Sequence, residues 1–248
     1  VHLAYILPPL HNKALMEDIN INGTRNVLDC CKDPQVKHLL YSSSATAYGF
    51  HADNPVPMTE EQPLRGNDNF TYCKNKKEIE ALFSNFVEGN PEKIVTILRP
   101  CFVIGPGIEN PISRFLLKPL VILPSKNAPL QFIHEDDLFK AIELCLSNEI
   151  EGTYNLSGDG AVSFKELLNI TGSKSIKLPV GVATLLNQLA WTLRIKSLTE
   201  MPSAGLAMVK YPWITTSEKF KQRASFQFKY SSLEAFQHFW ESKRKKCK

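Results

Sequence analysis

A tyrosine and a lysine at a spacing of four residues could form an acid/base pair. Tyr72 and Lys76 lie in the segment TYCKNKKEIEALF, and positions i and i+4 share one face of a helix. A neighbouring ammonium favours the phenolate, which would lower the pKa of the tyrosine from about 10 toward neutral pH, where the side chain can exchange protons with a substrate. The alternative is a tyrosine at a helix start beside a solvated lysine, because this spacing also arises by chance.

Three consecutive serines support the catalytic alternative. The segment LLYSSSATAYG runs from a hydrophobic strand into Ser42, Ser43 and Ser44. Parallel sheets bind ligands at the carboxyl ends of their strands, so a hydroxyl group at this position can reach a ligand. We interpret Ser42 and Ser43 as residues that only end the strand, which leaves Ser44 as the candidate donor.

Strand-like and helix-like segments alternate through the first part of the chain, and this order is typical of an α/β fold with a doubly wound parallel sheet. After Gly107 the segments become proline-rich and less regular. We expect residues 1–107 to belong to a dinucleotide-binding domain and residues 108–248 mainly to a smaller C-terminal substrate lobe, with 128–150 returning to the first domain. The strands are expected at 1–7, 36–44 and 93–105, and the helices at 15–32 and 75–89.

Composition argues against several classes of partner. The net charge is +4, and much of the basic excess lies in the final ESKRKKCK, which we interpret as a frayed, solvated tail and not as a nucleic-acid site. The six cysteines form no C-x-x-C pair and the six histidines are scattered, so we expect reduced thiols, no metal and a cytoplasmic protein. The apolar stretch 178–195 is interpreted as a helix with one buried face, so membrane association is not expected.

Seven segments in a consistent order resemble the extended short-chain dehydrogenase/reductases, specifically the NAD-dependent epimerase/dehydratase family that includes UDP-galactose 4-epimerase. This resemblance implies a Rossmann-like fold, NAD or NADP as cofactor, a small-molecule substrate and a homodimer as one arrangement. The segments are VHLAY, NINGTRNVLDCC, YSSSATAYG, YCKNK, LRPCFVIGPG, FIHEDDL and WITTSEKFKQRASFQFKYSS.

The resemblance also implies a role for each matched residue. Tyr72 would be the acid/base, and Lys76 would lower its pKa and hydrogen-bond the nicotinamide ribose. Ser44 would hydrogen-bond the reacting oxygen, and Asn20 would support the lysine through water. The other residues implied at the site are Leu3, Ala4, Pro100 and Phe102 for the cofactor, and Ala45, Thr46 and Arg223 for the substrate. Arg99 is instead interpreted as a structural charge at a strand end.

The glycine-rich fingerprint G-x-x-G-x-x-G of this family does not occur in the 248 residues. That turn receives the cofactor pyrophosphate, so the resemblance implies that the N-terminal βαβαβ portion is missing. The chain would be either a fragment that alone binds NAD weakly or a shortened paralogue without cofactor binding. Three functions remain open. The first is an oxidoreductase or epimerase for a nucleotide-sugar-like substrate, and the second is a dehydrogenase for an apolar steroid-like alcohol or ketone, suggested by Phe102 and the apolar helix 178–195. The third is a non-catalytic binding protein.

Overall fold

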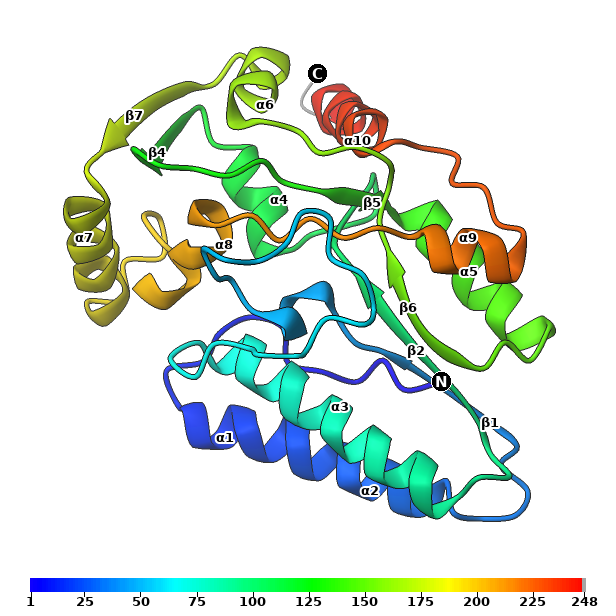
Figure 1. Cartoon of the computed structure of the whole chain (residues 1–248). Helices are drawn as coiled ribbons and strands as arrows, with labels where there is room; N and C mark the ends of the chain where they lie inside the picture. The colour runs from blue at the N-terminus through cyan, green and yellow to red at the C-terminus, as the bar shows by residue number, and fades with distance from the viewer. Residues whose placement is uncertain (247–248) are drawn as a thin grey trace.

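Three parallel strands form the central sheet of the computed structural model, which describes residues 1–246 (Figure 1). β1 (His38–Ser42) pairs with β2 (Ile94–Pro100), and β2 pairs with β6 (Gly152–Leu156). Successive side chains of a strand point to opposite faces. Leu39 and Tyr41 therefore enter one hydrophobic cluster, and Leu40 enters another.

Helices cover both faces of this sheet, as the sequence predicted (Figure 1). On one face lie α1 (Lys13–Glu17), the π-helical turn η1 (Asp18–Asn22), α2 (Gly23–Cys30) and α3 (Thr71–Gly89). Leu28 of α2 and Phe83 of α3 pack there against the strands. On the other face lies α5 (Glu135–Ser147), whose Ala141 and Cys145 are fully buried. The fold is thus α/β with a doubly wound parallel sheet.

The strand predicted over residues 1–7 is only partly formed. His2 makes an isolated parallel bridge to Tyr41 beside β1, and its amide donates to Leu40 O at 2.7 Å. No further strand lies alongside this segment within residues 1–246, so it remains extended without a ladder. Leu3 is consequently exposed.

The remainder of the chain forms a lobe around two short parallel strand pairs. β3 (Phe102–Ile104) pairs with β5 (Phe132–His134), and β4 (Leu120–Pro124) pairs with β7 (Lys174–Leu178). The division into two domains stays a prediction, and β6 joins the central sheet although it follows residue 150. The helices of this part are α4 (Pro111–Leu116), α6 (Phe164–Thr171), α7 (Val180–Thr192), the 3-10 turn η3 (Ser203–Leu206), α8 (Ala207–Lys210), α9 (Glu218–Ala224) and α10 (Ser232–Lys246).

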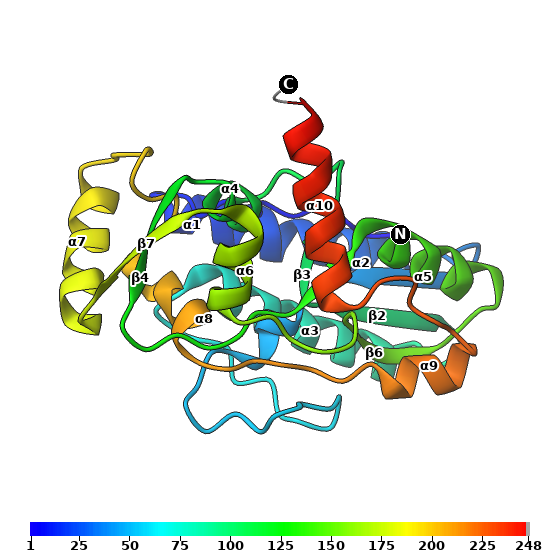
Figure 2. The same ribbon diagram turned by 90° about the horizontal axis from the view of Figure 1, so that it is seen from above.

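Two predictions for the C-terminal half need correction. The basic tail is helical, because α10 continues to Lys246; Cys247 and Lys248 lie outside the described residues. The helix predicted within 178–195 exists as α7, but it lacks the expected large buried face, because its buried residues are Ala183 and Ala190. Helix α7 lies at the periphery of the molecule in both views (Figures 1 and 2).

The cysteines among the described residues are free thiols, as expected. Within residues 1–246 no helix has the length and apolarity required to span a bilayer.

Candidate active site

A cavity of about 560 Å³ lies where the carboxyl ends of β1 and β2 face the C-terminal lobe. Most of its polar side chains come from the end of β1, the segment after it and the start of α3, Glu109 and Asn110 add two more, and most of its other walls are apolar. The walls include Leu3, Tyr5, Ser42, Ser43, Ser44, Thr46, Phe70, Tyr72, Lys76, Pro100, Phe102, Met201, Met208 and Trp213. The structure therefore brings the tyrosine, the lysine and the third serine of the sequence analysis to one cavity.

Helix α3 begins at Thr71, so its first turns present Tyr72 and Lys76 on the cavity side. Burial raises the pKa of Tyr72 to about 12, and the nearby hydroxyl groups of Ser44 and Thr46 partly oppose this increase. A phenol with this pKa is protonated at neutral pH. Tyr72 is thus prepared to donate a proton to an oxygen that gains negative charge.

Ser44 is held in place by the backbone around it. It is the N-terminal cap of the 3-10 turn η2 (Ala45–Tyr48), and its Oγ accepts a hydrogen bond from Thr46 N at 3.2 Å. The hydroxyl can also donate to Pro100 O, at the longer distance of 3.5 Å. Thr46 Oγ1 is buried and has no partner at bonding distance within the described residues. Ser44 and Thr46 therefore present to Tyr72 two hydroxyl groups that can form further hydrogen bonds.

Lys76 is only 3% exposed and sits in an aromatic cage. Its Nζ donates to Tyr41 Oη at 3.2 Å and to Ser42 O at 3.0 Å, and it lies 4.0 Å from the ring centroid of Tyr5. Burial lowers the pKa of Lys76 to about 7, although the Glu80 carboxylate opposes the change. The ammonium points to Tyr41 and Ser42, so the predicted lowering of the Tyr72 pKa by Lys76 is wrong for this arrangement.

Asn20 lies in the π-helical turn and not on the cavity wall. Its Oδ1 accepts a hydrogen bond from Ile6 N at 2.8 Å, which fixes the segment that carries Tyr5. Its buried Nδ2 has no partner within residues 1–246, and neither polar atom of the Asn75 side chain has one. Buried polar groups usually find partners or an ordered water. Asn20 thus supports the cage around Lys76 indirectly, and the water-mediated contact remains a prediction.

The other predicted site residues divide into two groups. Leu3, Thr46, Pro100 and Phe102 line the cavity, whereas Ala4 and Ala45 do not. Ala45 is fully buried behind the wall, and Ala4 is exposed. These two positions therefore contribute through the backbone at most.

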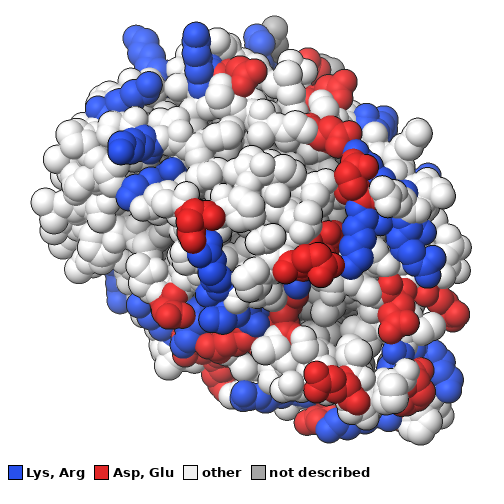
Figure 3. Space-filling view, viewed as in Figure 1, with Lys and Arg blue, Asp and Glu red and all other residues white. Residues whose placement is uncertain are grey.

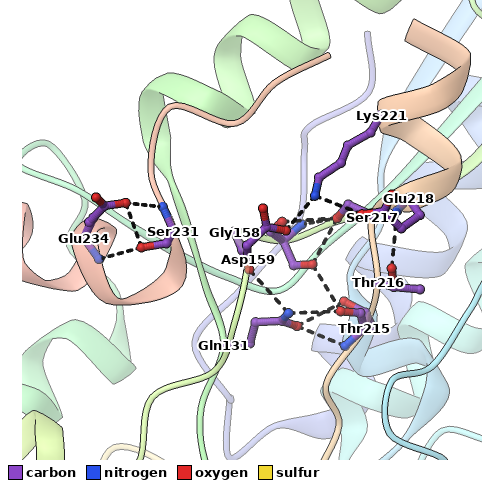
Figure 4. A network of polar contacts seen from close by, with 11 residues as sticks. Gln131, Gly158, Asp159, Thr215, Thr216, Ser217, Glu218, Lys221, Ser231 and Glu234 are labelled. Carbon is purple, nitrogen blue, oxygen red and sulfur yellow. Dashed lines mark hydrogen bonds and ion pairs between the residues drawn. The ribbon is translucent and has the colours of Figure 1, made fainter. Parts of the chain in front are cut away.

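Arg223 is not brought to the cavity. Its helix α9 is tied to the far side of the lobe, because Ser217 Oγ accepts from Ser157 N at 2.7 Å and Lys221 Nζ lies 2.7 Å from Asp159 Oδ1 (Figure 4). Arg223 lies beside Tyr154 and opposes the burial that raises the pKa of that phenol. A substrate contact by Arg223 would require α9 to leave this network.

Arg99 is a structural charge, as the sequence analysis proposed. Its guanidinium contacts both carboxylate oxygens of Glu80, at 2.6 to 3.0 Å, and donates to Tyr48 Oη at 2.7 Å. Ser43 Oγ donates to the same carboxylate, and Tyr48 Oη donates to Asn155 Oδ1 at 2.8 Å. Burial alone would lower the pKa of Arg99, but the Glu80 carboxylate raises it. This cluster, which we call the Glu80 network, locks α3 to the central sheet.

Sequence reasoning missed the roles of several aromatic side chains. Tyr5, on the cavity wall, and Tyr41, behind it, form the cage around Lys76. Trp213 on the wall packs edge-on against Phe102 with ring centroids 4.7 Å apart. They come from parts of the chain far from Tyr72, and no local spacing in the sequence joins them to it.

Comparison with known proteins identifies the family. Residues 2–157 match the profile of the NAD dependent epimerase/dehydratase family, which is more than half of the chain. The chain belongs to this family. Its cofactor is therefore of the NAD type, and the family resemblance in the sequence is confirmed.

Two sequence relatives and a solved structure show the range of the epimerase/dehydratase family around this chain. An uncharacterized protein of Mycobacterium tuberculosis is 26% identical over 94% of this chain, which spans 62% of that relative's length. A 3beta-hydroxysteroid-dehydrogenase/decarboxylase of Arabidopsis thaliana is 26% identical over 85% of this chain and 38% of its own length. The UDP-glucose 4-epimerase of Thermotoga maritima superposes with a TM-score of 0.73 at 19% identity, covering all of this chain and 77% of the other, and thereby shares the fold.

Proposed function

We propose that the protein is an NAD-dependent oxidoreductase that interconverts a secondary alcohol and a ketone on a largely apolar substrate. One observation carries this proposal: the partly buried Tyr72 phenol faces the Ser44 and Thr46 hydroxyl groups in a cavity whose remaining walls are mostly apolar.

The proton chemistry follows from the pKa values of Tyr72 and Lys76. In ketone reduction, Tyr72 Oη donates its proton to the carbonyl oxygen as the carbonyl carbon accepts a hydride. Ser44 Oγ and Thr46 Oγ1 hydrogen-bond the same oxygen while negative charge develops on it. Lys76, whose pKa is lowered to about 7 by burial, is a second group that titrates near neutral pH.

The cavity residues fit the nicotinamide end of NAD, which supplies or accepts the hydride when it is bound. Lys76 carries a buried ammonium that can donate to ribose hydroxyl groups, and Pro100 with Phe102 offers an apolar wall for the ring. Thr46 Oγ1 is a buried acceptor without a partner among the described residues. Retention of these groups in one cavity argues against a non-catalytic binding protein.

The substrate class follows from the charges on the wall. A nucleotide sugar carries a diphosphate, which proteins bind with arginine, lysine or backbone amides at a helix N-terminus. Lys76 is the only basic side chain among the described wall residues, and it is already held by Tyr41 and Ser42. The apolar residues Phe102, Met201 and Met208 instead suit an alicyclic substrate. The likeness to the Arabidopsis hydroxysteroid enzyme points in the same direction.

The test is an assay of NADH formation with two matched substrates, a 3β-hydroxysteroid and UDP-glucose, in parallel with NADP as cofactor. We expect turnover of the steroid alcohol and no epimerisation or oxidation of UDP-glucose. Tyr72→Phe serves as the control for site-specific chemistry. Turnover of UDP-glucose in preference to the steroid would restore the nucleotide-sugar alternative. Failure of both substrates to react, in protein that binds NAD, would contradict the proposed activity.

A further inference from the structure

Helix α7 is oriented opposite to an ordinary surface helix. A surface helix normally turns its large apolar side chains toward the core. Here the inner face carries Ala183 and Ala190, whereas Leu185 and Leu193 are 61% and 68% exposed. Trp191 near the end of the helix stacks on His11, with ring centroids 4.0 Å apart, and so holds the helix in this orientation.

The exposed apolar surface continues beyond the helix onto the adjacent strand pair. Leu120 and Ile122 of β4 and Ile176 of β7 are each about half exposed, and Ile122 pairs directly with Ile176. A groove of about 450 Å³ runs between α7 and β4. We call this surface the α7 face; its exposed members are Leu120, Ile122, Ile176, Val182, Leu185, Leu186, Leu189, Leu193, Ile195 and Leu198. A contiguous exposed apolar patch of this kind marks an interaction site.

The charges around the α7 face are almost all positive. The two segments that build it, 110–126 and 167–210, contain eight lysine and arginine residues and a single acidic residue, Glu200. Glu200 is engaged by Arg114 in an ion pair. Lys174 and Lys196 are exposed, and Lys174 pairs directly with the exposed Leu120 in the β4–β7 pair. Figure 3 shows the outer left edge, where α7 lies, as a white surface with blue side chains above it.

We propose that the α7 face docks onto the surface of a lipid bilayer that contains anionic headgroups. Apolar side chains enter the headgroup boundary while basic side chains contact lipid phosphates, which is the arrangement of interfacial protein segments. A second copy of the chain fits this face poorly, because a symmetric interface sets each patch against the same patch. The basic rims of two copies would then repel one another.

The groove beneath α7 also leads toward the candidate active site. Pro111, Ile112, Met201 and Met208 line both the groove and the cavity that holds Tyr72. A bilayer at the α7 face could therefore deliver an apolar substrate along a wall of apolar side chains. This delivery step rests on the proposed function, whereas docking itself does not.

Flotation of the protein with vesicles tests the proposal without any turnover. Vesicles of phosphatidylcholine mixed with phosphatidylglycerol are compared with vesicles of phosphatidylcholine alone. We expect binding to the anionic vesicles, weakened at least about tenfold by Leu185→Glu and by Lys174→Glu combined with Lys196→Glu. The matched controls lie on α5, on the other side of the molecule: Phe139→Glu replaces a side chain that is also 61% exposed, and Lys140→Glu reverses an exposed charge.

Several outcomes would overturn the proposal. One is no binding of the wild type to anionic vesicles, and another is equal weakening by Leu185→Glu and Phe139→Glu. A third is a dimer in light scattering that Leu185→Glu dissociates while vesicles remain unbound, which would assign the face to a second copy. Thermal unfolding of each variant shows that a loss of binding does not arise from a loss of folding.

Discussion

Helix α3 carries two polar clusters that lie one turn apart and differ in how completely they are hydrogen-bonded. In the Glu80 network, the carboxylate of Glu80 is held by Arg99 and Ser43, and Tyr48 is held on both sides. Around Tyr72 and Lys76, by contrast, Thr46 Oγ1 and the side chain of Asn75 are buried without partners within the described residues. Both clusters contain buried ionisable groups, yet only the Glu80 network is closed, in the sense that its buried polar groups have hydrogen-bond partners.

The difference separates a structural role from a functional one. A buried charge that is fully paired fixes the position of its helix, and removing one partner leaves the other charge exposed to the low-dielectric interior. Buried groups without partners cost stability, and a protein retains them where a ligand completes the hydrogen bonds. We therefore interpret the Glu80 network as the anchor of α3 and the Tyr72 cluster as the chemical site that this anchor positions.

The largest expected effect comes from breaking the closed cluster. Arg99→Met leaves the Glu80 carboxylate buried without its cation, so we expect the free energy of unfolding to fall by about 3–5 kcal/mol. Urea denaturation measures this loss. Arg99→Met combined with Glu80→Leu is the control and should recover much of it, because no lone charge remains. A loss below about 1 kcal/mol in the single variant would contradict an anchoring role.

The neighbouring residues Ser43 and Ser44 belong to different clusters, so replacing each one tests the two roles separately. Ser44→Ala removes a hydroxyl that faces the phenol, so we expect kcat/KM to fall about 10²–10³-fold with the fold intact. Ser43→Ala is the matched control, since its hydroxyl donates to Glu80. That variant should lose about 1–3 kcal/mol of stability and little catalysis. The reverse pattern would exchange the roles assigned to the two clusters.

Lys76→Met should increase stability while it removes activity, unlike the variants of the Glu80 network, which lose stability. The buried ammonium is costly, so its replacement by an apolar side chain should raise stability by about 1–4 kcal/mol at neutral pH and abolish catalysis. Burial lowers the pKa of Lys76 from its ordinary 10.5 to about 7. Between these values the unfolded chain binds the extra proton, so wild-type stability rises with pH. The gain from the variant should therefore be greatest below about pH 7 and shrink toward pH 10.5, as unfolding curves at several pH values would show.

Arg223→Met should have the smallest effect. The side chain is exposed on α9 and lies outside the cavity, so we expect stability to change by no more than about 0.5 kcal/mol. The value of kcat/KM should also remain unchanged. A large rise in KM would mean that α9 reaches the substrate after all.

The sequence was sufficient for features that depend on local rules. The spacing of Tyr72 and Lys76 on a helix, and the position of Ser44 at the end of a strand, are set by residues near in the chain. The alternation of strand and helix segments likewise predicted the sheet. These parts of the fold and of the candidate site were predicted because each needs only one element.

Other features depend on contacts between distant segments. The tyrosine cage of Lys76 joins Tyr5, Tyr41 and α3, and its geometry directs the ammonium away from Tyr72. The place of Arg223 depends on bonds from α9 to Ser157 and Asp159. The inward face of α7 could not be predicted, because small residues rather than leucines pack against the lobe.

The most direct test removes one phenol hydroxyl from each cluster and measures both the free energy of unfolding and kcat/KM. Tyr72→Phe is predicted to keep its stability within about 1 kcal/mol and to lose about 10²–10⁴-fold in kcat/KM. Tyr48→Phe is predicted to lose about 1–3 kcal/mol of stability, because Arg99 and Asn155 lose a partner, and to keep most of its activity. Unchanged catalysis in Tyr72→Phe would contradict the assignment of the open cluster as the chemical site.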